Sequence, residues 1–387
     1  MKRLRVGVIY GGRSGEHEVS VASAASILKH LDRDRYEPVA IRIEKDGRWQ
    51  LSDRSPTAVS ASEVLELART QAARPVRQDR ETLMLARPGT DAILTIEHRG
   101  SDTGNDGRGA VVHALGLDVI FPVLHGPYGE DGTVQGLLEL ANIPYVGPSV
   151  IGAAVGMDKG VMKTLFAAQG LPQAKYVVVL KREWERSPAD VLDRVTRALG
   201  FPVFVKPANL GSSVGISKAQ DAGAFGPAME LAAQFDRKLV IEAAVPDARE
   251  IECAVLGNDD PVASVPGEIV PGHEFYDYNA KYLDTGATLL IPAPLTDAQR
   301  AKVQRLSIAA FKSVEGCGMA RVDFLMDKRR GTLFLNEVNT IPGFTTVSMY
   351  PKLWEASGLS YGALIDRLIA LALERHAEKQ RLRTSVT

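Results

Sequence analysis

Short apolar runs alternate with helical patterns over the first third of the chain. Residues 4–10 (LRVGVIY) form an apolar run typical of a short buried strand, and the glycine-rich segment GGRSGEHEVS follows at once. Residues 19–31 place apolar side chains at helical spacing, and residues 38–43 and 117–126 are typical of two further strands. A strand, a glycine loop and a helix in this order usually begin an open α/β sheet. We therefore expect an N-terminal α/β domain over residues 1–147.

A different alternation follows residue 147, with strands and helices in turn. A helix is predicted over residues 149–169, with Ser149 as a suitable N-cap and Gly170 as a stop signal. The remaining elements of this part are strands at 176–180, 201–207, 214–218 and 239–245 and helices at 188–199 and 223–235. Together they predict a central α+β domain over residues 148–245.

The last third is richer in strands. The elements expected here are a strand at 250–257, a long irregular stretch at 267–287, a helix at 296–315, a hairpin at 320–340 and a helix at 360–376. Residues 375–387 are expected to be a solvated or frayed end. These elements define a third predicted domain, residues 246–387.

Composition narrows the class of protein. The 387 residues are 45% hydrophobic, which suits two or three globular domains. The formal net charge is −1, so no global field favours nucleic acid or an acidic membrane. No apolar run approaches the ~18 residues of a membrane span or the length of a signal peptide core. Two cysteines cannot form a disulfide framework, and a reduced cytoplasm fits best.

The strongest chemical signal is the hairpin at 320–340. If KRRGT is its loop, Asp323 lies opposite Glu337 and Arg321 opposite Asn339, all on one face. The other face would carry Val322, Phe324, Phe334 and Val338. Opposed carboxylates repel each other, so a hard cation such as Mg²⁺ between them would explain the pattern. The alternative is an exposed face whose charges are simply hydrated.

Two lysines are candidates for binding a polyphosphate. Lys206 precedes NLGSSVG, whose glycines and hydroxyl groups offer donors to a phosphate, although an ordinary β-turn explains the same residues. The chain lacks the GxxxxGK[ST] sequence of a Walker-type loop. Lys159 falls within the apolar stripe of the predicted helix at 149–169, where it either extends to solvent or reaches into a cleft.

Three further residues and one loop allow two readings each. Glu242 and Glu250 are surface carboxylates or ligands of adenine or ribose. His125 follows a buried strand, where open α/β sheets place ligand groups, and it is a binding residue or a structural histidine. The aromatic stretch 267–287 is a lid over the substrate or a packed Ω-loop.

Taken together, these motifs resemble the ATP-grasp superfamily and, within it, the D-alanine–D-alanine ligase family. The segments that carry the resemblance occur in the family's order over about residues 6–351: GGRSGEHEVS, HGPYGEDGTVQG, MDKGVMK, KPANLGSSVG, EFYDYNAKY, ARVDF and NEVNTIPGFTTVSMYP. Two departures stand out. Added material lies around residues 45–110, and the adenine segment reads EAAV, so backbone groups must supply most base contacts there. The resemblance implies an α/β ATP-grasp fold behind an N-terminal open α/β domain.

The resemblance also implies roles for particular residues. Glu16 would hold the ammonium of the first D-alanine, His125 would lie near its carboxylate, and Ser348 would bind the carboxylate of the second. The residues implied to contact ATP are Lys159 and Lys206 at the phosphates, Glu242 and Val245 in the adenine segment, Glu250 at the ribose, and Ser212 and Lys281.

The remaining implied roles concern catalysis. Asp323, Glu337 and Asn339 would carry two Mg²⁺ ions. Arg321 and the Gly343 N–H would form an oxyanion site, and Ser212 and Tyr282 would join Glu16 in a hydrogen-bonded triad that latches the lid.

The implied activity is ATP-dependent ligation of two D-alanines through a D-alanyl phosphate, for peptidoglycan precursor synthesis in a bacterial cytoplasm. ATP and Mg²⁺ are the implied cofactors, with Mn²⁺ and K⁺ as further candidate ions, and a homodimer is the implied assembly. The alternatives are a ligase that uses D-serine or D-lactate as second substrate, a more general carboxylate–amine ligase, and a non-catalytic nucleotide-binding module. The DYNAKY segment with Tyr282 favours the dipeptide-forming type over the depsipeptide-forming type.

Overall fold

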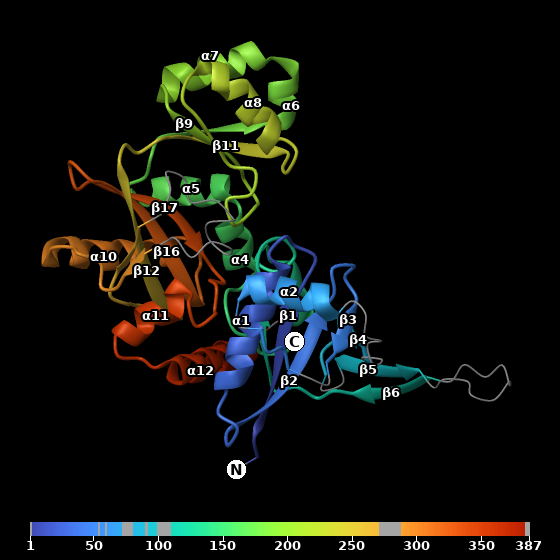
Figure 1. Cartoon of the computed structure of the whole chain (residues 1–387). Coiled ribbons are helices and arrows are strands. Elements are labelled where there is room, and N and C mark those ends of the chain that lie inside the picture. Colours follow the sequence, from blue (N-terminus) through green and yellow to red (C-terminus); the bar gives the residue numbers. More distant parts are fainter. Residues whose placement is uncertain are drawn as a thin grey trace. The chain divides into compact units, whose positions relative to one another are not determined.

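A seven-stranded sheet is the core of one half of the chain in the computed structural model (Figure 1). The structure describes residues 2–52, 55–58, 60–71, 80–89, 92–98, 110–270 and 288–383. Two compact units divide them: the first comprises Met1–Val150, Gly343–Pro351 and Leu359–Thr387, and the second comprises Ile151–Pro342 and Lys352–Gly358. Both units combine helices with sheets, as the α/β prediction requires. The three-domain division stays a prediction.

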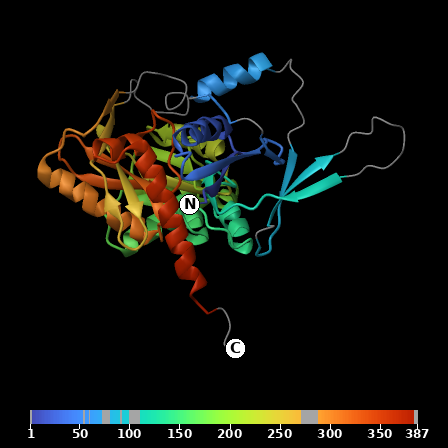
Figure 2. The same ribbon diagram turned by 90° about the horizontal axis from the view of Figure 1, so that it is seen from below.

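The first unit's sheet has the order β6-β5-β4-β3-β2-β1-β7. Its strands are β1 (Leu4–Gly11), β2 (Tyr36–Ile43), β3 (Trp49–Leu51), β4 (Arg80–Met84), β5 (Ile93–His98), β6 (Ala110–Ala114) and β7 (Val119–Val123). β1 pairs in parallel with β2 and β7, and the added strands β3 to β6 pair antiparallel. The region around 45–110 therefore extends the sheet on the β2 side, where Figure 2 shows β5 and β6 as a paired ribbon in teal.

Helices α1 (His17–His30), α2 (Ala61–Gln71), α3 (Thr133–Leu140) and α12 (Tyr361–Gln380) complete the first unit, and α11 (Met349–Ala356) spans a boundary between the units. Gly11 ends β1 with φ of 91°, and a Cβ there would lie 2.3 Å from the Ile43 carbonyl oxygen. Only glycine fits this turn. The predicted strand, glycine loop and helix are thus present, with the helix starting two residues earlier than expected.

The second unit holds two sheets. The four-stranded sheet has the order β10-β9-β11-β8 and the other has the order β15-β14-β12-β16-β17, with β13 on β12. The strands are β8 (Tyr176–Leu180), β9 (Val203–Pro207), β10 (Ser217–Ala219), β11 (Lys238–Ala243), β12 (Ala248–Gly257), β13 (Val262–Ala263), β14 (Gly267–Val270), β15 (Thr288–Leu290), β16 (Gly318–Asp327) and β17 (Leu333–Asn339). The helices are α4 (Val150–Met157), α5 (Lys159–Ala168), α6 (Lys181–Arg186), α7 (Pro188–Leu199), α8 (Ala222–Ala232) and α10 (Asp297–Ser313).

The single helix expected over 149–169 is wrong, because the chain breaks at Asp158. Asp158 leaves the helical conformation (φ −83°, ψ 98°), and its carboxylate accepts hydrogen bonds from the backbone N–H groups of Gly160 and Val161, both at 3.0 Å. An aspartate that caps a new helix satisfies donors that a continuous helix would not expose. Lys159 consequently opens α5 instead of lying within one long helix.

The hairpin register is confirmed near the predicted site and corrected beyond it. Asp323 pairs with Glu337 and Arg321 with Asn339, as expected. The register then shifts, so that Phe324 lies opposite Leu335 and Asn336 becomes an extra residue. This β-bulge reverses the alternation of faces. Phe334, expected on the apolar face, is only half-buried, and its place in the core is taken by Leu335, which is 1% exposed.

The C-terminal helix extends further than predicted. α12 ends at Gln380 instead of 376, so residues 375–380 of the expected solvated end over 375–387 are helical. The Arg375 guanidinium lies 4.6 Å above the Tyr145 ring and donates hydrogen bonds to the carbonyls of Tyr145 and Gly147. This stacking on an aromatic ring anchors a segment whose sequence is mostly charged.

No single helix in the described parts of the chain is long and apolar enough to cross a membrane, although α11 and α12 taken together have the length and composition of a bent span.

Candidate active site

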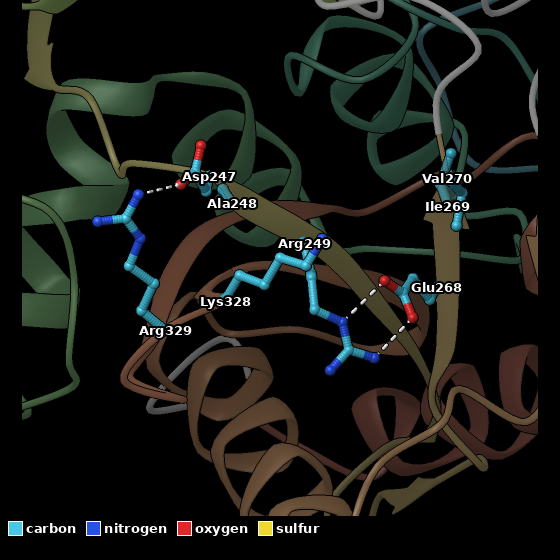
Figure 3. A pocket seen from close by; sticks show the side chains of 8 residues that line it. All are labelled: Asp247, Ala248, Arg249, Glu268, Ile269, Val270, Lys328 and Arg329. Carbon is cyan, nitrogen blue, oxygen red and sulfur yellow. Dashed lines mark hydrogen bonds and ion pairs between the residues drawn. The ribbon is translucent and has the colours of Figure 1, made fainter.

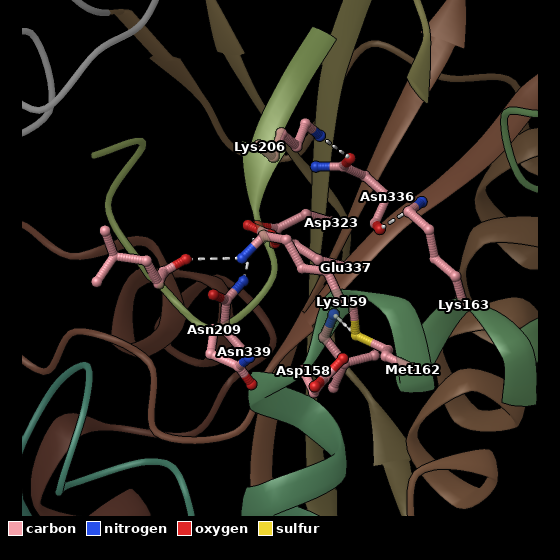
Figure 4. Close-up of polar contacts among 12 residues, drawn as sticks. Asp158, Lys159, Met162, Lys163, Lys206, Asn209, Asp323, Asn336, Glu337 and Asn339 are labelled. Carbon is pink, nitrogen blue, oxygen red and sulfur yellow. Dashed lines mark hydrogen bonds and ion pairs between the residues drawn. The ribbon is translucent and has the colours of Figure 1, made fainter. Parts of the chain in front are cut away.

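Lys206 of β9 and Glu242 of β11 lie on the same face of two neighbouring strands of the second unit, and Figure 4 shows Lys206 beside Asn336. The Lys206 Nζ lies 3.2 Å from Glu242 Oε1 and 3.4 Å from the side-chain oxygen of Asn336. Glu242 is 3% exposed, yet its Oε1 accepts no well-directed hydrogen bond among the described residues. A buried carboxylate oxygen of this kind is suited to accept a hydrogen bond from a ligand.

A second lysine, which the sequence reasoning missed, contacts the same carboxylate. Lys163 is 1% exposed, and its Nζ lies 3.3 Å from Glu242 Oε2 and donates to the Asn336 carbonyl at 3.3 Å. Burial alone would raise the pKa of Glu242, but the ammonium groups of Lys163 and Lys206 outweigh it and hold that pKa below its usual value. The available signal was spacing, since Lys163 follows Lys159 by one helical turn.

Lys159 lies in the first turn of α5 and is buried, so its side chain does not extend to solvent. Its Nζ donates to the Leu210 carbonyl at 2.8 Å and lies 3.6 Å from Glu337. Leu210 is the second residue of the predicted phosphate loop NLGSSVG, in which Ser212 and Ser213 both have positive φ, 51° and 59°. Each such non-glycine residue costs on the order of 1–3 kcal/mol, and backbone strain of this kind clusters at ligand-binding loops. The lysine and the loop therefore lie together.

The acidic pair of the hairpin is surrounded by cations of the chain itself. Arg321 donates to both carboxylate oxygens of Asp323, at 2.8 and 2.7 Å, and also lies 3.0 Å from Glu252. Asn339 Nδ2 donates to Asp323 at 2.8 Å. Arg321 and Lys159 thus relieve the repulsion that we had assigned to a metal.

The donor set nevertheless fits Mg²⁺. Among the described residues no group of three or more His, Cys, Asp or Glu side chains could hold a metal. Mg²⁺ does not need one, because it binds to one or two carboxylates and completes its coordination with water and substrate phosphate oxygens. Asp323 and Glu337, with the Asn339 amide, supply that kind of partial set, and metal binding here stays a prediction.

The first unit brings its own candidates together around α1. Glu16, 8% exposed, directly precedes the helix and packs so closely that a Cβ on Gly126 would lie 2.7 Å from its Oε2. The Ser14 hydroxyl donates to the His125 carbonyl at 2.6 Å, and His125 Nε2 lies 3.3 Å from the Ser23 hydroxyl. Glu16 and His125 therefore belong to one cluster of side chains.

Ser23 links this cluster to a distant segment and was not predicted. Its hydroxyl accepts a hydrogen bond from the Phe344 N–H at 3.1 Å. The Ser348 hydroxyl accepts from the Thr345 N–H at 3.0 Å, and a Cβ on Gly343 would lie 3.1 Å from it. Gly343 and Ser348 thus form one turn, which Ser23 ties to His125. A buried serine in an otherwise apolar helix was the available signal.

Two of the other predicted residues lie on or beside strands of the second unit. Val245 and Glu250 are half-buried, Val245 just after β11 and Glu250 in β12 opposite Leu325 and Ile269. The stretch predicted as an irregular lid over 267–287 begins instead with a strand, since Gly267–Val270 form β14. Residues 271–287 of that stretch, which include Lys281 and Tyr282, lie outside the described residues. The triad of Ser212, Tyr282 and Glu16 stays a prediction.

A pocket of about 670 Å³ in the second unit lies away from these groups (Figure 3). Its wall includes Arg249, which holds Glu268 through two hydrogen bonds of 2.8 and 2.6 Å, and Arg329, paired with Asp247 at 3.2 Å. Arg249 and Glu250 are successive strand residues, so their side chains point to opposite faces of the sheet. The residues that line this pocket therefore include none of the candidate site residues described above.

Comparisons with known proteins agree over both units. Residues 5–148 match the family described as D-ala D-ala ligase N-terminus, and residues 165–370 match the one described as D-ala D-ala ligase C-terminus. A D-alanine–D-alanine ligase of Heliobacterium modesticaldum is 48% identical over 381 residues, which are 98% of each chain.

Two solved structures show the same likeness. The D-alanine-D-alanine ligase from Coxiella burnetii has a TM-score of 0.77 at 35% identity and covers 98% of this chain and 97% of its own. The VanG D-Ala:D-Ser ligase from Enterococcus faecalis has a TM-score of 0.80 at 28% identity and covers 96% and 100%. These likenesses confirm the ATP-grasp fold that the sequence motifs imply.

Proposed function

The chain belongs to the D-alanine–D-alanine ligase family, and from this premise we infer that it joins two D-alanines into D-alanyl-D-alanine with cleavage of ATP to ADP. The observation that carries the conclusion is the match to the family over both halves at 48% identity. The described geometry supports it, because one unit gathers cations beside an acidic pair and the other gathers small polar groups. The product serves peptidoglycan precursor synthesis.

The reaction follows from the weakness of a carboxylate as an electrophile. The carboxylate of the first D-alanine attacks the γ-phosphorus of ATP, ADP leaves, and an acyl phosphate forms. The amine of the second D-alanine then attacks the acyl carbon, loses a proton and displaces inorganic phosphate. Each step moves negative charge between oxygen atoms, so fixed positive groups lower the barrier by electrostatic stabilisation.

We propose particular roles for the residues of the second unit. Lys159 and Lys206 bind the phosphates, exchanging their contacts with Leu210 and Glu242 for phosphate oxygens. Glu242 accepts from the adenine amino group through the oxygen that lacks a well-directed hydrogen bond. Val245 contributes backbone contacts to the base, Glu250 binds the ribose, and Ser212 and Lys281 complete the nucleotide site.

In the first unit, Glu16 binds the ammonium of the first D-alanine and His125 lies near its carboxylate. Ser348 binds the carboxylate of the second D-alanine. The Gly343 N–H, together with Arg321 of the second unit, stabilises the oxyanion of the tetrahedral intermediate. A lid over residues 267–287, latched through Tyr282 and Ser212 to Glu16, protects the acyl phosphate from water.

Mg²⁺ is the metal that we propose for the hairpin, held by Asp323, Glu337 and Asn339. When bound, it supplies Lewis-acid stabilisation of phosphate charge. Two ions per site, replacement by Mn²⁺ and stimulation by K⁺ are further parts of this proposal, as are a homodimer and a bacterial cytoplasmic location.

The deciding experiment measures ADP release from Mg²⁺-ATP together with product masses. D-alanine alone is expected to give turnover and a D-alanyl-D-alanine mass, and L-alanine is expected to give neither. The likeness to the VanG D-Ala:D-Ser ligase makes D-serine an alternative second substrate, so D-alanine with D-serine is a separate arm of the experiment. D-alanine with D-lactate is a further arm, for the depsipeptide-forming alternative. Turnover only in a mixture would identify D-serine or D-lactate, instead of D-alanine, as the second substrate. Nucleotide binding without turnover in any arm would favour a non-catalytic module.

A further inference from the structure

Lys163 is more deeply buried than Lys206, the other lysine that contacts Glu242. Its side chain is 1% exposed, whereas the side chain of Lys206, which contacts the same carboxylate, is 11% exposed. Burial lowers the pKa of Lys163, opposed by Glu242. Removing an ammonium from water carries a large desolvation penalty, so an isolated structural ion pair at Glu242 would need only one lysine. The structure uses two.

The presence of Lys163 beside Glu242 is explained if Lys206 moves away from this carboxylate when a nucleotide binds. Lys206 contacts Glu242 at 3.2 Å and Asn336 at a long 3.4 Å, and it has the larger exposed fraction. Once its ammonium turns to a phosphate, Glu242 would be a fully buried carboxylate without a countercharge. Breaking a buried pair in this way is strongly destabilising.

We propose that Lys163 is a positioning residue that stays with Glu242, as its permanent countercharge, when Lys206 moves to the phosphates of the nucleotide. Its fixed position follows from three contacts on different elements: Glu242 of β11 at 3.3 Å, the Asn336 carbonyl of β17 at 3.3 Å, and the Tyr176 ring of β8, whose centroid is 5.8 Å away. The inference rests on the proposed function only for the movement of Lys206.

The charged groups around this pair define what a variant would do. Glu242 faces Lys163 on α5 and Lys206 on β9, and Lys163 is also under the influence of Glu337 on β17. Without Lys163, nucleotide binding would remove the last cation beside Glu242. The carboxylate would then take up a proton as the nucleotide binds.

The test is calorimetric titration of Lys163→Met with ADP and Mg²⁺, in buffers of different ionisation enthalpy and from pH 6 to 9. We expect the variant to take up about one proton more per ADP than the unaltered protein at pH 8. Its Kd, relative to that of the unaltered protein, should rise by up to about tenfold per pH unit. Lys181→Met on α6, where the side chain is 44% exposed, is the matched control and should change neither quantity.

A double variant separates this role from a packing role. Lys163→Met with Glu242→Gln lacks the group that takes up the proton, so the extra proton should disappear. The same proton count in Lys163→Met as in the unaltered protein would overturn the proposal. If Lys163→Met does not fold or bind, Lys163→Gln, which keeps a hydrogen-bond donor, decides by the same measurement.

If the double variant folds while Lys163→Met and Lys163→Gln do not, the result also supports Lys163 as the countercharge of Glu242. If none of the three variants folds, the proposal is overturned in favour of a purely structural lysine. D-alanine-dependent ADP release by the unaltered protein reports separately on the proposed function.

Discussion

The two units meet different electrostatic demands with different chemistry. In the first, the candidate site is built largely from neutral contacts: serine hydroxyls, backbone N–H groups and a histidine around one glutamate. In the second, ammonium, guanidinium and carboxylate groups lie within about 4 Å of one another in a buried setting. A small zwitterion needs shape and a few directed hydrogen bonds, whereas a polyphosphate needs concentrated positive charge.

The largest effect is expected from removing charge in the second unit. Asp323→Ala should lower ADP release by about 10²–10³-fold or more, since fixed charges at the reacting phosphate give the greatest rate effects. Asp259→Ala, at an exposed turn of the same unit, is the control. Steady-state kinetics with D-alanine provides the measurement, and unchanged turnover would remove Asp323 from the metal site.

Crowding the first unit should change amino-acid binding. At Gly126, φ is 75° and a Cβ would lie 2.7 Å from Glu16 Oε2, so Gly126→Ala combines backbone strain with displacement of Glu16. Gly170 has φ of 65° but open space around it, which makes Gly170→Ala a control for strain alone. Each should lose about 1–2 kcal/mol of stability. Only Gly126→Ala should also raise the KM for D-alanine; an equal KM in both variants would contradict the placement of Glu16.

A smaller effect is expected from removing one neutral hydrogen-bonding group, the Ser23 hydroxyl, from the first unit. Ser23→Ala removes the acceptor of the Phe344 N–H and the partner of His125, and we expect a loss of about 1–3 kcal/mol in the free energy of unfolding. The KM for D-alanine should rise while the Kd for ADP stays constant. Urea unfolding, steady-state kinetics and calorimetry measure the three quantities in turn, and a parallel loss of ADP affinity would show that the two sites are not chemically separate.

The smallest effect concerns pH. Burial lowers the pKa of His17 in the first unit from its ordinary 6.5, helped by Arg42. The unfolded chain therefore binds the proton first, and stability should fall as the pH drops below about 6.5 through the lowered pKa, by at most about 1.4 kcal/mol per pH unit. His17→Asn should flatten this dependence in urea unfolding, and His113→Asn, at an exposed site, should not. An unchanged slope in His17→Asn would place the titrating group elsewhere.

The same contrast explains what the sequence could predict. Charged and polar residues at every second position of two predicted strands allowed the pairs Asp323–Glu337 and Arg321–Asn339 to be predicted, because this alternation can be read from the sequence itself. The role of Ser23 depends on a partner 321 residues away, and no local pattern encodes that distance. Lys163 was overlooked because a lysine one turn from Lys159 could as well have pointed to solvent, and only packing shows that it is enclosed.

Local irregularities were the other limit. The break before α5 depends on two hydrogen bonds to Asp158, and periodicity continues through it undisturbed. The bulge in β17 has the same character, since one extra residue leaves the composition of a strand unchanged. The types of the elements that a clear pattern marks were therefore predictable, while α2 and β4 to β6 in the region 52–110 and the atoms that depart from regular geometry were not.

The β-bulge at Asn336 is not required to pair β16 with β17, but it provides two contacts of the candidate site. Asp323 pairs with Glu337 and Phe324 with Leu335, so a shorter chain lacking Asn336 would close the same hairpin with the same faces. What such a chain would lose is the carbonyl that receives Lys163 and the amide oxygen beside Lys206. The contacts of Asn336 with Lys163 and Lys206 therefore belong to the candidate site and not to the closure of the hairpin, and deleting this one residue would separate the two.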